Sequence, residues 1–413
     1  MQGLEGDYYK LVLCEGAKKL LLVFSSADAA KGKFTFFKSA IDLPAHKLYL
    51  NDKNYYQRGI AGLGETVDEV VQVILSWKQQ LGVEEIYIFG SSMGSFGAML
   101  YGAKLNAKVL CFGPRAILKY KGIKLIEHMP KNVKNNLFWR ILKKIKLISR
   151  LPKSTNAVYK DLRPMLEKSQ VPILVYAGEA NQGDLITSIL LNASCNATCI
   201  HLRGVGHKVP EFLHRKMKIG KVIAGFLADE PIVDLDESSD LYETIDEVKP
   251  LLRIEKAIKK GKLASAKQLL LEHIQKEPQS DLAHYKLGIV LSKLKDFKNA
   301  AAHQREAIKL CPHFANAHLQ LGTCLNKLKK YEAALVYLQR AQELTVKISS
   351  AYYQAAISLE NLQRFDECEI MLEKAVEQAP KKKKYQIKFV KISKKNAERK
   401  LNEADEKQLV SSM

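Results

Sequence analysis

The strongest constraint on the fold is a 34-residue period in the second half of the chain. Small side chains recur at three positions of each period and would let two helices of a hairpin approach closely. An aromatic ring would fill the gap beside them, and a proline would end the second helix. The positions in register are Gly288, Gly322, Ala356; Phe297, Tyr331, Phe365; Ala300, Ala334, Cys368; Ala307, Ala341, Ala375; and Pro278, Pro312, Pro380. The period predicts stacked helical hairpins, with Lys381 to about Lys400 as a basic capping helix.

The first half of the chain contains a short apolar run that ends in Gly-x-Ser-x-Gly. Residues 86–97 read Ile-Tyr-Ile-Phe-Gly-Ser-Ser-Met-Gly-Ser-Phe-Gly, and a helix-compatible run follows. This order of strand, sharp turn and helix is typical of a turn that exposes a nucleophilic serine at a helix N-terminus. Gly90 and Gly94 lack Cβ atoms, so the strand and helix could approach closely around Ser92. The pattern therefore predicts Ser92 as a nucleophile.

Strand and helix patterns alternate around this turn. Apolar runs predict strands at 8–14, 19–24, 48–50, 109–112, 172–178 and 198–202, and a helix is expected over 66–81. Such alternation predicts the α/β class, with a mostly parallel sheet covered by helices on both faces. Ligands bind such sheets at the carboxyl ends of the strands, and Ser92 lies at one of these ends.

A nucleophilic serine needs a base to accept its proton and a carboxylate to orient that base. His207 is the best placed of ten histidines, because it lies in a glycine-bordered loop after the last predicted strand. Asp184 and Glu179 both follow the strand that ends at Gly178, with Asp184 favoured and Glu179 as the alternative acid. Asn181 occupies a position where an acid is also expected, so a Ser–His dyad without an acid remains an option.

The order Ser92, acid, His207 makes residues 8–227 resemble the α/β-hydrolase superfamily, and residues 247–382 resemble tetratricopeptide repeats. The first resemblance implies an oxyanion hole made by the backbone N–H groups of Met93 and Ser26. It implies no metal and no bound organic cofactor, although an acetyltransferase would use a donor such as acetyl-CoA. A less specific resemblance runs from Leu50-Asn51-Asp52 through Tyr56 and Gly59 to the serine turn. It is to bacterial hydrolase-fold proteins of surface-glycan synthesis, some of which are esterases or O-acetyltransferases.

The charge of the chain is unusual and unevenly distributed. A net charge of +21 either indicates an acidic partner or reflects a host whose proteins have lysine-rich helix surfaces. Residues 115–153 carry twelve lysines or arginines and one acid, within a lid-like insertion expected over 115–165. This segment could cover an acidic glycan substrate, lie on an anionic membrane surface, or be a packed helix with a lysine-rich outer face. A nucleic-acid partner is not favoured. Residues 229–247 carry nine acids and no base, which predicts a linker.

The predicted domain order is a catalytic domain at 1–228, the acidic linker at 229–247, a repeat domain at 248–400 and a tail at 401–413. Seven scattered cysteines, with neither a signal-like N-terminus nor a long apolar span, favour the cytoplasm, with peripheral membrane attachment open. Two function classes remain. The chain is either a serine hydrolase or acyltransferase whose repeats hold a protein partner in their concave face, or a non-catalytic repeat scaffold with a vestigial hydrolase domain.

Overall fold

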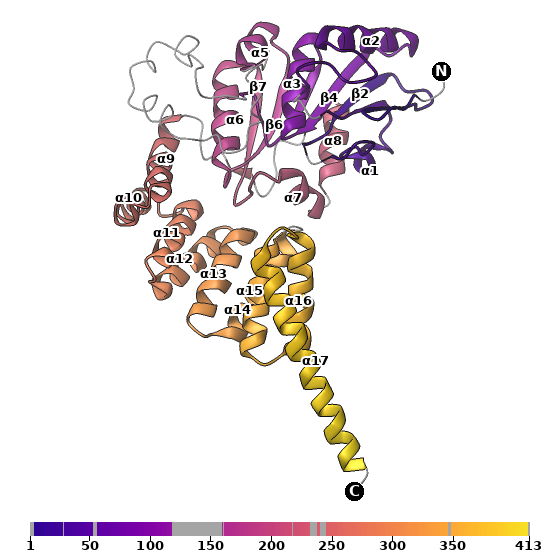
Figure 1. The fold of residues 1–413 in the computed structure, drawn as a ribbon. Helices are drawn as coiled ribbons and strands as arrows, with labels where there is room; N and C mark the ends of the chain where they lie inside the picture. Colours follow the sequence, from indigo (N-terminus) through magenta and orange to yellow (C-terminus); the bar gives the residue numbers. More distant parts are fainter. Residues whose placement is uncertain are drawn as a thin grey trace. The chain divides into compact units, whose positions relative to one another are not determined.

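The computed structural model describes residues 4–27, 29–52, 56–117, 159, 161–216, 218–231, 238–239, 245–345 and 348–411. The chain divides into two compact units, Met1–Lys249 and Pro250–Met413 (Figure 1). Most of the insertion expected at 115–165, including its basic segment from 118 onward, lies outside the described residues. So does much of the acidic linker expected at 229–247.

The first unit contains an eight-stranded sheet in the described part of the chain, with the order β1-β3-β2-β4-β5-β6-β7-β8. Neighbouring strands from β3 to β7 run parallel, and only the edge strands β1 and β8 pair antiparallel. The mostly parallel sheet predicted from the sequence is confirmed. The strands are β1 Tyr9–Val12, β2 Lys19–Phe24, β3 His46–Leu50, β4 Glu85–Ser91, β5 Lys108–Phe112, β6 Ile173–Gly178, β7 Ala197–Leu202 and β8 Ser238–Ser239.

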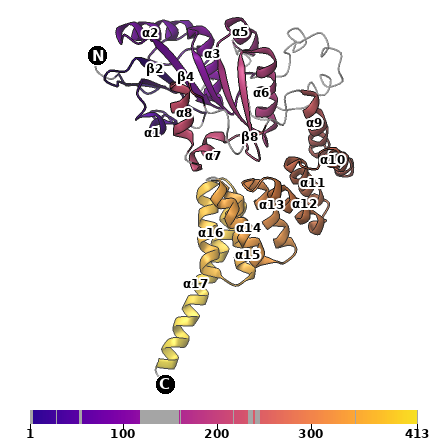
Figure 2. The same ribbon diagram turned by 180° about the vertical axis from the view of Figure 1, so that it is seen from behind.

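Helices cover both faces of this sheet (Figures 1 and 2). One layer packs α3 against β2, β4 and β5 and α6 against β6 and β7, with α2 and α5 beside them. On the other face, α7 packs on β6 and contacts α8, which also meets α1. These helices are α1 Phe37–Ala40, α2 Val67–Gln80, α3 Met93–Leu105, α5 Arg163–Ser169, α6 Gln182–Ser194, α7 Val209–Arg215 and α8 Ile219–Leu227.

The chain order of the strands creates a switch point in the sheet. The connection from β2 leads to its neighbour β3 on one side, and the connection from β3 crosses back to β4 on the other side of β2. In open α/β sheets, ligands bind in the crevice beyond the carboxyl ends of the strands at such a point. Ser26 follows β2 and Ser92 follows β4, so both predicted site residues lie at the switch point.

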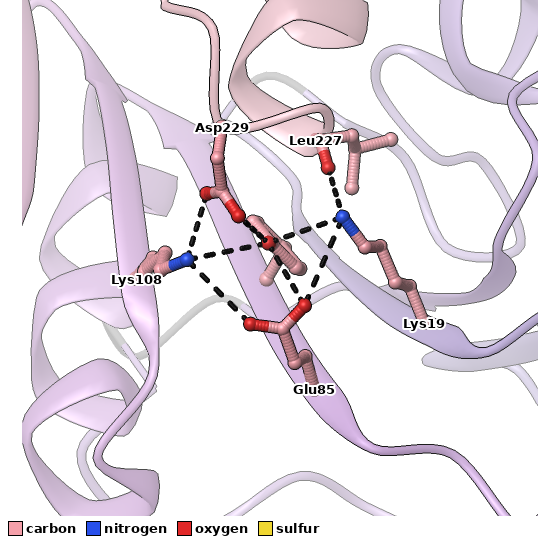
Figure 3. A network of polar contacts seen from close by, with 6 residues as sticks. Lys19, Glu85, Lys108, Leu227 and Asp229 are labelled. Atoms are coloured by element: carbon pink, nitrogen blue, oxygen red, sulfur yellow. Dashed lines mark hydrogen bonds and ion pairs between the residues drawn. The ribbon is translucent and has the colours of Figure 1, made fainter.

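A network of charged and hydroxyl groups lies near the start of β2, β4 and β5 (Figure 3). The buried Tyr87 hydroxyl donates to Asp229 Oδ2 at 2.7 Å and accepts from Lys19 Nζ at 3.2 Å and Lys108 Nζ at 3.4 Å. Lys108 also pairs with Asp229 Oδ1 at 2.7 Å, and Glu85 closes the cluster. The network connects Asp229, just after α8, to the first residues of these three strands.

The second unit is a stack of antiparallel helix pairs. Gly288 and Gly322 lie where the two helices of a pair meet. A Cβ on Gly288 would lie 2.3 Å from the Gln304 side chain, and one on Gly322 would lie 2.5 Å from that of Leu338. The helices are α9 Ile245–Lys259, α10 Leu263–Lys276, α11 Asp281–Lys293, α12 Phe297–Leu310, α13 Ala315–Lys327, α14 Tyr331–Leu344, α15 Ser349–Asn361, α16 Phe365–Gln378 and α17 Lys383–Ser411.

The 34-residue period also appears in the backbone. Lys295, Lys329 and Gln363 turn the chain between paired helices, and their φ angles are 65°, 59° and 59°. None is glycine, so the sequence did not mark these turns. The last helix continues to Ser411, through the segment that was expected to be a separate tail. Residues 401–411 contain no proline or glycine and are rich in good helix formers.

Candidate active site

Ser92 lies in a strained turn between β4 and α3. Its φ and ψ are 54° and −112°, a region that non-glycine residues rarely adopt. A Cβ on Gly94 would lie 2.2 Å from the Phe24 carbonyl oxygen, and one on Gly90 would lie 2.2 Å from that of Gly94. Both positions therefore require glycine. The close approach of α3 to β2 and β4 holds Ser92 in its turn.

The structure brings the three predicted side chains together in one line of contacts. His207 Nε2 lies 2.7 Å from Ser92 Oγ. On the other side of the ring, His207 Nδ1 lies 2.8 Å from each carboxylate oxygen of Asp184. Both separations are within hydrogen-bond reach. With Nδ1–H donated to the carboxylate, Nε2 presents a lone pair to the serine hydroxyl, as a general base requires.

Asp184 owes its position to a capped helix. It lies in the first turn of α6, and the side chain of Asn181 caps this helix by accepting the Asp184 N–H at 3.0 Å. The sequence suggested that Asn181 stands where the catalytic acid was expected. In the structure Asn181 instead helps to position the acid, Asp184. Glu179 is also buried, directly after β6, where its N–H donates to the Leu202 carbonyl. The contact with His207 in this structure is made by Asp184.

Burial controls the electrostatics of this acid. Asp184 is only 3% exposed, and this desolvation raises the pKa of its carboxyl above 3.8. The hydrogen bond and charge of His207, together with the charge of Arg115, act in the opposite direction and lower that pKa. A carboxylate held away from water interacts more strongly with the imidazole, because solvent screening is reduced.

The two predicted oxyanion donors are in different situations. Met93 is the first residue of α3, and an N–H in the first turn has no partner within the helix. The Ser26 N–H donates to the Thr35 hydroxyl at 3.3 Å, while the Thr35 N–H donates to Ser25 Oγ at 3.1 Å. A substrate oxygen would have to replace the Thr35 hydroxyl at Ser26. Thr35 lies nine residues along the chain from Ser26, and no motif pointed to it.

Residues that the sequence reasoning missed support the serine and the histidine. Ser95 Oγ donates to the Ser92 carbonyl at 2.6 Å and accepts the Arg115 N–H at 3.0 Å. Gly113 has a φ of 60°, and a Cβ there would lie 3.1 Å from His207 Nδ1. Gly113 directly follows the strand predicted at 109–112, and this position could have identified it. Ser95 carries no comparable signal.

The described residues were also searched for a metal site and for a membrane-spanning helix. In that part of the chain, no group of three or more His, Cys, Asp or Glu side chains is arranged to hold a metal ion. No helix of the described ranges is both long and apolar enough to cross a bilayer.

Comparison with known proteins identifies the second unit. The tetratricopeptide repeat family profile matches residues 282–314, 315–345 and 349–382, so the repeats predicted from the sequence are confirmed. A search of curated proteins found no match.

Solved structures of repeat proteins also match the chain, and three of them are similar at low identity. MamA from Desulfovibrio magneticus RS-1 is 21% identical over 39% of this chain and 92% of its own, with a TM-score of 0.35. YrrB, a TPR protein with an unusual peptide-binding site, is 22% identical over 39% of this chain and 79% of its own, with a TM-score of 0.33. The first TPR of Spaghetti, bound to an HSP90 peptide, is 20% identical over 29% and 94%, with a TM-score of 0.28.

Proposed function

We propose that the first unit is an α/β-hydrolase-type domain that acts as a serine-dependent ester hydrolase or O-acyltransferase. The observation that carries this proposal is the unbroken line of contacts from Ser92 through His207 to Asp184. The three residues follow three different strands, so this alignment does not arise from local chain geometry. The strained backbone at Ser92 adds support, because strain of this kind clusters at functional sites.

In the proposed mechanism, Ser92 Oγ attacks an ester carbonyl while His207 Nε2 takes the hydroxyl proton. The C–O bond to the leaving alcohol then breaks, and His207 gives that proton to the departing oxygen. Asp184 holds the imidazole and stabilises its protonated form. The oxyanion binds the N–H of Met93 and, once Thr35 has moved, that of Ser26. Water or a sugar hydroxyl then attacks the acyl-serine and gives its proton to His207 Nε2. The bond to Ser92 Oγ breaks, and His207 returns the proton to that oxygen.

The substrate class is inferred from the weaker resemblance to bacterial glycan-modifying enzymes. We propose an acyl ester of a glycan as substrate, with an activated donor such as acetyl-CoA as co-substrate if the reaction is transfer. Hydrolysis and transfer are separated by product analysis: an activated acetyl donor is offered with and without a glycan acceptor. Transfer requires acceptor-dependent acetylation, whereas equal acetate release in both samples supports hydrolysis.

The repeats are proposed to hold a protein partner in their concave face. Tetratricopeptide repeats stack into curved surfaces that are used for binding, and this unit contains three matched repeats. YrrB has an unusual peptide-binding site, and the first TPR of Spaghetti binds an HSP90 peptide. In this chain the repeats would bring the first unit to its substrate or to a partner enzyme.

A fluorophosphonate probe tests the enzymatic proposal on the full chain. We expect covalent labelling of the native protein, and none for Ser92→Ala or for a heat-denatured sample. Ser188→Ala is a matched control, because Ser188 Oγ also lies 2.8 Å from a histidine nitrogen, that of His201, but the pair is buried. This variant should label like the native protein. Absence of labelling on folded protein would refute the enzymatic role.

The scaffold alternative is favoured by one observation, the contact between the Ser26 N–H and Thr35, which occupies a predicted oxyanion donor. A scaffold would bind its partner undiminished when Ser92 is changed to alanine and would not react with the probe. Labelling at Ser92 therefore separates the two classes.

A further inference from the structure

The outer face of α17 carries large aliphatic and lysine side chains together. We define it as Lys383, Ile387, Val390, Lys391 and Lys394. At 100° per residue these positions fall within one arc of the helix, opposite Tyr385 and Ile392. Ile387 is 69% and Val390 is 66% exposed, among the most exposed large aliphatic side chains of the described residues.

The opposite face of α17 packs on the repeats between Tyr385 and Asn396. Tyr385 stacks on Tyr353 with ring centroids 4.5 Å apart, and Ile392 is completely buried. Asn396 donates to Asp366 at 3.1 Å and to Glu369 at 2.9 Å. These contacts explain how the helix caps the stack of repeats. They do not explain the aliphatic side chains of the outer face, which point away from it.

The charge of this helix exceeds what the stack neutralises. Over its full length, Lys383–Ser411, the helix contains nine basic residues and four acids. Lys388 pairs with Glu360, and Arg399 and Lys400 pair with Asp366, all through the inner side of the helix. Lys383 and Lys391 are exposed on the outer face. Lys394 is 79% exposed, and its pair with Glu398 is long, at 3.9 Å.

We infer that the outer face of α17 binds an anionic lipid surface. Lysines beside aliphatic side chains suit the boundary between phosphate head groups and acyl chains. The aliphatic groups enter that boundary while the long lysine stems carry their charges to the phosphates. Nucleic acid would satisfy the lysines but not Ile387 and Val390. A second copy of this face would oppose like charges. The inference is independent of the proposed catalytic function.

Co-sedimentation of the full chain with vesicles tests this inference. Phosphatidylcholine vesicles are compared with vesicles that also contain phosphatidylglycerol. We expect binding only to the second, weakened by added salt, because lysines near an anionic surface act through screened charge. Each lysine contributes roughly fivefold in affinity. Lys383→Gln with Lys391→Gln should therefore weaken binding on the order of tenfold or more.

A matched pair of double variants identifies the face responsible. Ile387→Asp with Val390→Asp should abolish binding. Val336→Asp with Ile370→Asp changes the net charge equally, at aliphatic positions that are 65% and 48% exposed on other helices. This control should retain most of the binding. Equal circular dichroism spectra would show that both variants fold.

Three outcomes would overturn the inference. The first is no preference of the native chain for anionic vesicles, including the case where it binds only RNA or an acidic polypeptide. The second is binding that survives the α17 variants, because another part of the chain would then hold the lipid. The third is an equal loss in the test and control variants, which would show that only net charge matters.

Discussion

Replacing Asp184 with asparagine most directly tests the line of contacts from Ser92 through His207 to Asp184. The amide keeps the shape of the carboxylate but offers only one acceptor oxygen to His207 Nδ1, which now lies 2.8 Å from two. The charge that would stabilise a protonated imidazole is lost as well. An NH2 group turned toward the ring would select the tautomer that cannot accept the Ser92 proton.

The size of the effect follows from these contacts. A hydrogen bond to a charged group contributes about 1.5–3 kcal/mol, which alone corresponds to roughly ten- to hundredfold in rate. Selection of the wrong tautomer raises the loss toward about 10⁴-fold, as in serine protease triads. We therefore expect the fluorophosphonate labelling rate of Asp184→Asn to fall about 10²- to 10⁴-fold.

Stability should not follow activity in this variant. Burial raises the pKa of Asp184, so its ionised form is disfavoured in the folded protein relative to water. A neutral amide removes that cost while it loses part of the hydrogen bonding. The thermal midpoint of Asp184→Asn should consequently stay close to that of the native protein. A lower labelling rate with an unchanged thermal midpoint would show that the variant loses activity because the contact between Asp184 and His207 is altered.

Glu179→Gln is the matched control, since Glu179 is an equally buried acid that follows the same strand. Its labelling rate should remain near the native value. Native-rate labelling of Asp184→Asn would refute the role assigned to Asp184. Loss of labelling in Glu179→Gln alone would make Glu179 the functional acid.

Three further changes have defined outcomes. Gly113→Ala should lower the labelling rate, because the added Cβ displaces His207. The control is Gly32→Ala, at φ 70° with no atom within 4 Å of the added Cβ, which should cost similar stability (about 1–2 kcal/mol) and leave labelling intact. Equal labelling rates of the two variants would contradict this. Tyr87→Phe should lower the unfolding free energy by about 1 kcal/mol in urea denaturation, more than Tyr49→Phe, whose hydroxyl makes a single 3.4 Å contact. Burial lowers the pKa of His303 and His318 below 6.5, so the unfolded chain binds protons more readily, and stability present above pH 6.5 is lost as the pH falls below it. Urea unfolding is followed by circular dichroism at 222 nm. A urea midpoint that does not decrease from neutral to mildly acidic pH would refute this.

Local pattern was sufficient wherever a steric requirement restricts a residue type. The 34-residue register of small residues predicted the repeats, because only Gly, Ala or Cys fits where paired helices meet. Gly90 and Gly94 marked the serine turn for the same reason, since a Cβ at either would strike backbone 2.2 Å away. The alternation of apolar runs predicted a mostly parallel sheet. The turn residues Lys295, Lys329 and Gln363 escaped notice because a positive φ there is imposed by the helices on both sides.

Tertiary structure decided which groups meet across the sheet. Asp184 and Glu179 follow the same strand, and only the placement of α6, capped by Asn181, brings a carboxylate to 2.8 Å from His207. The contact of Thr35 with Ser26 and that of Tyr87 with Asp229, 142 residues apart, likewise depend on how the elements pack. Sequence pattern records which backbone shapes are sterically allowed. A hydrogen bond forms or fails over less than 1 Å, and that distance is set by the packing of whole helices and strands.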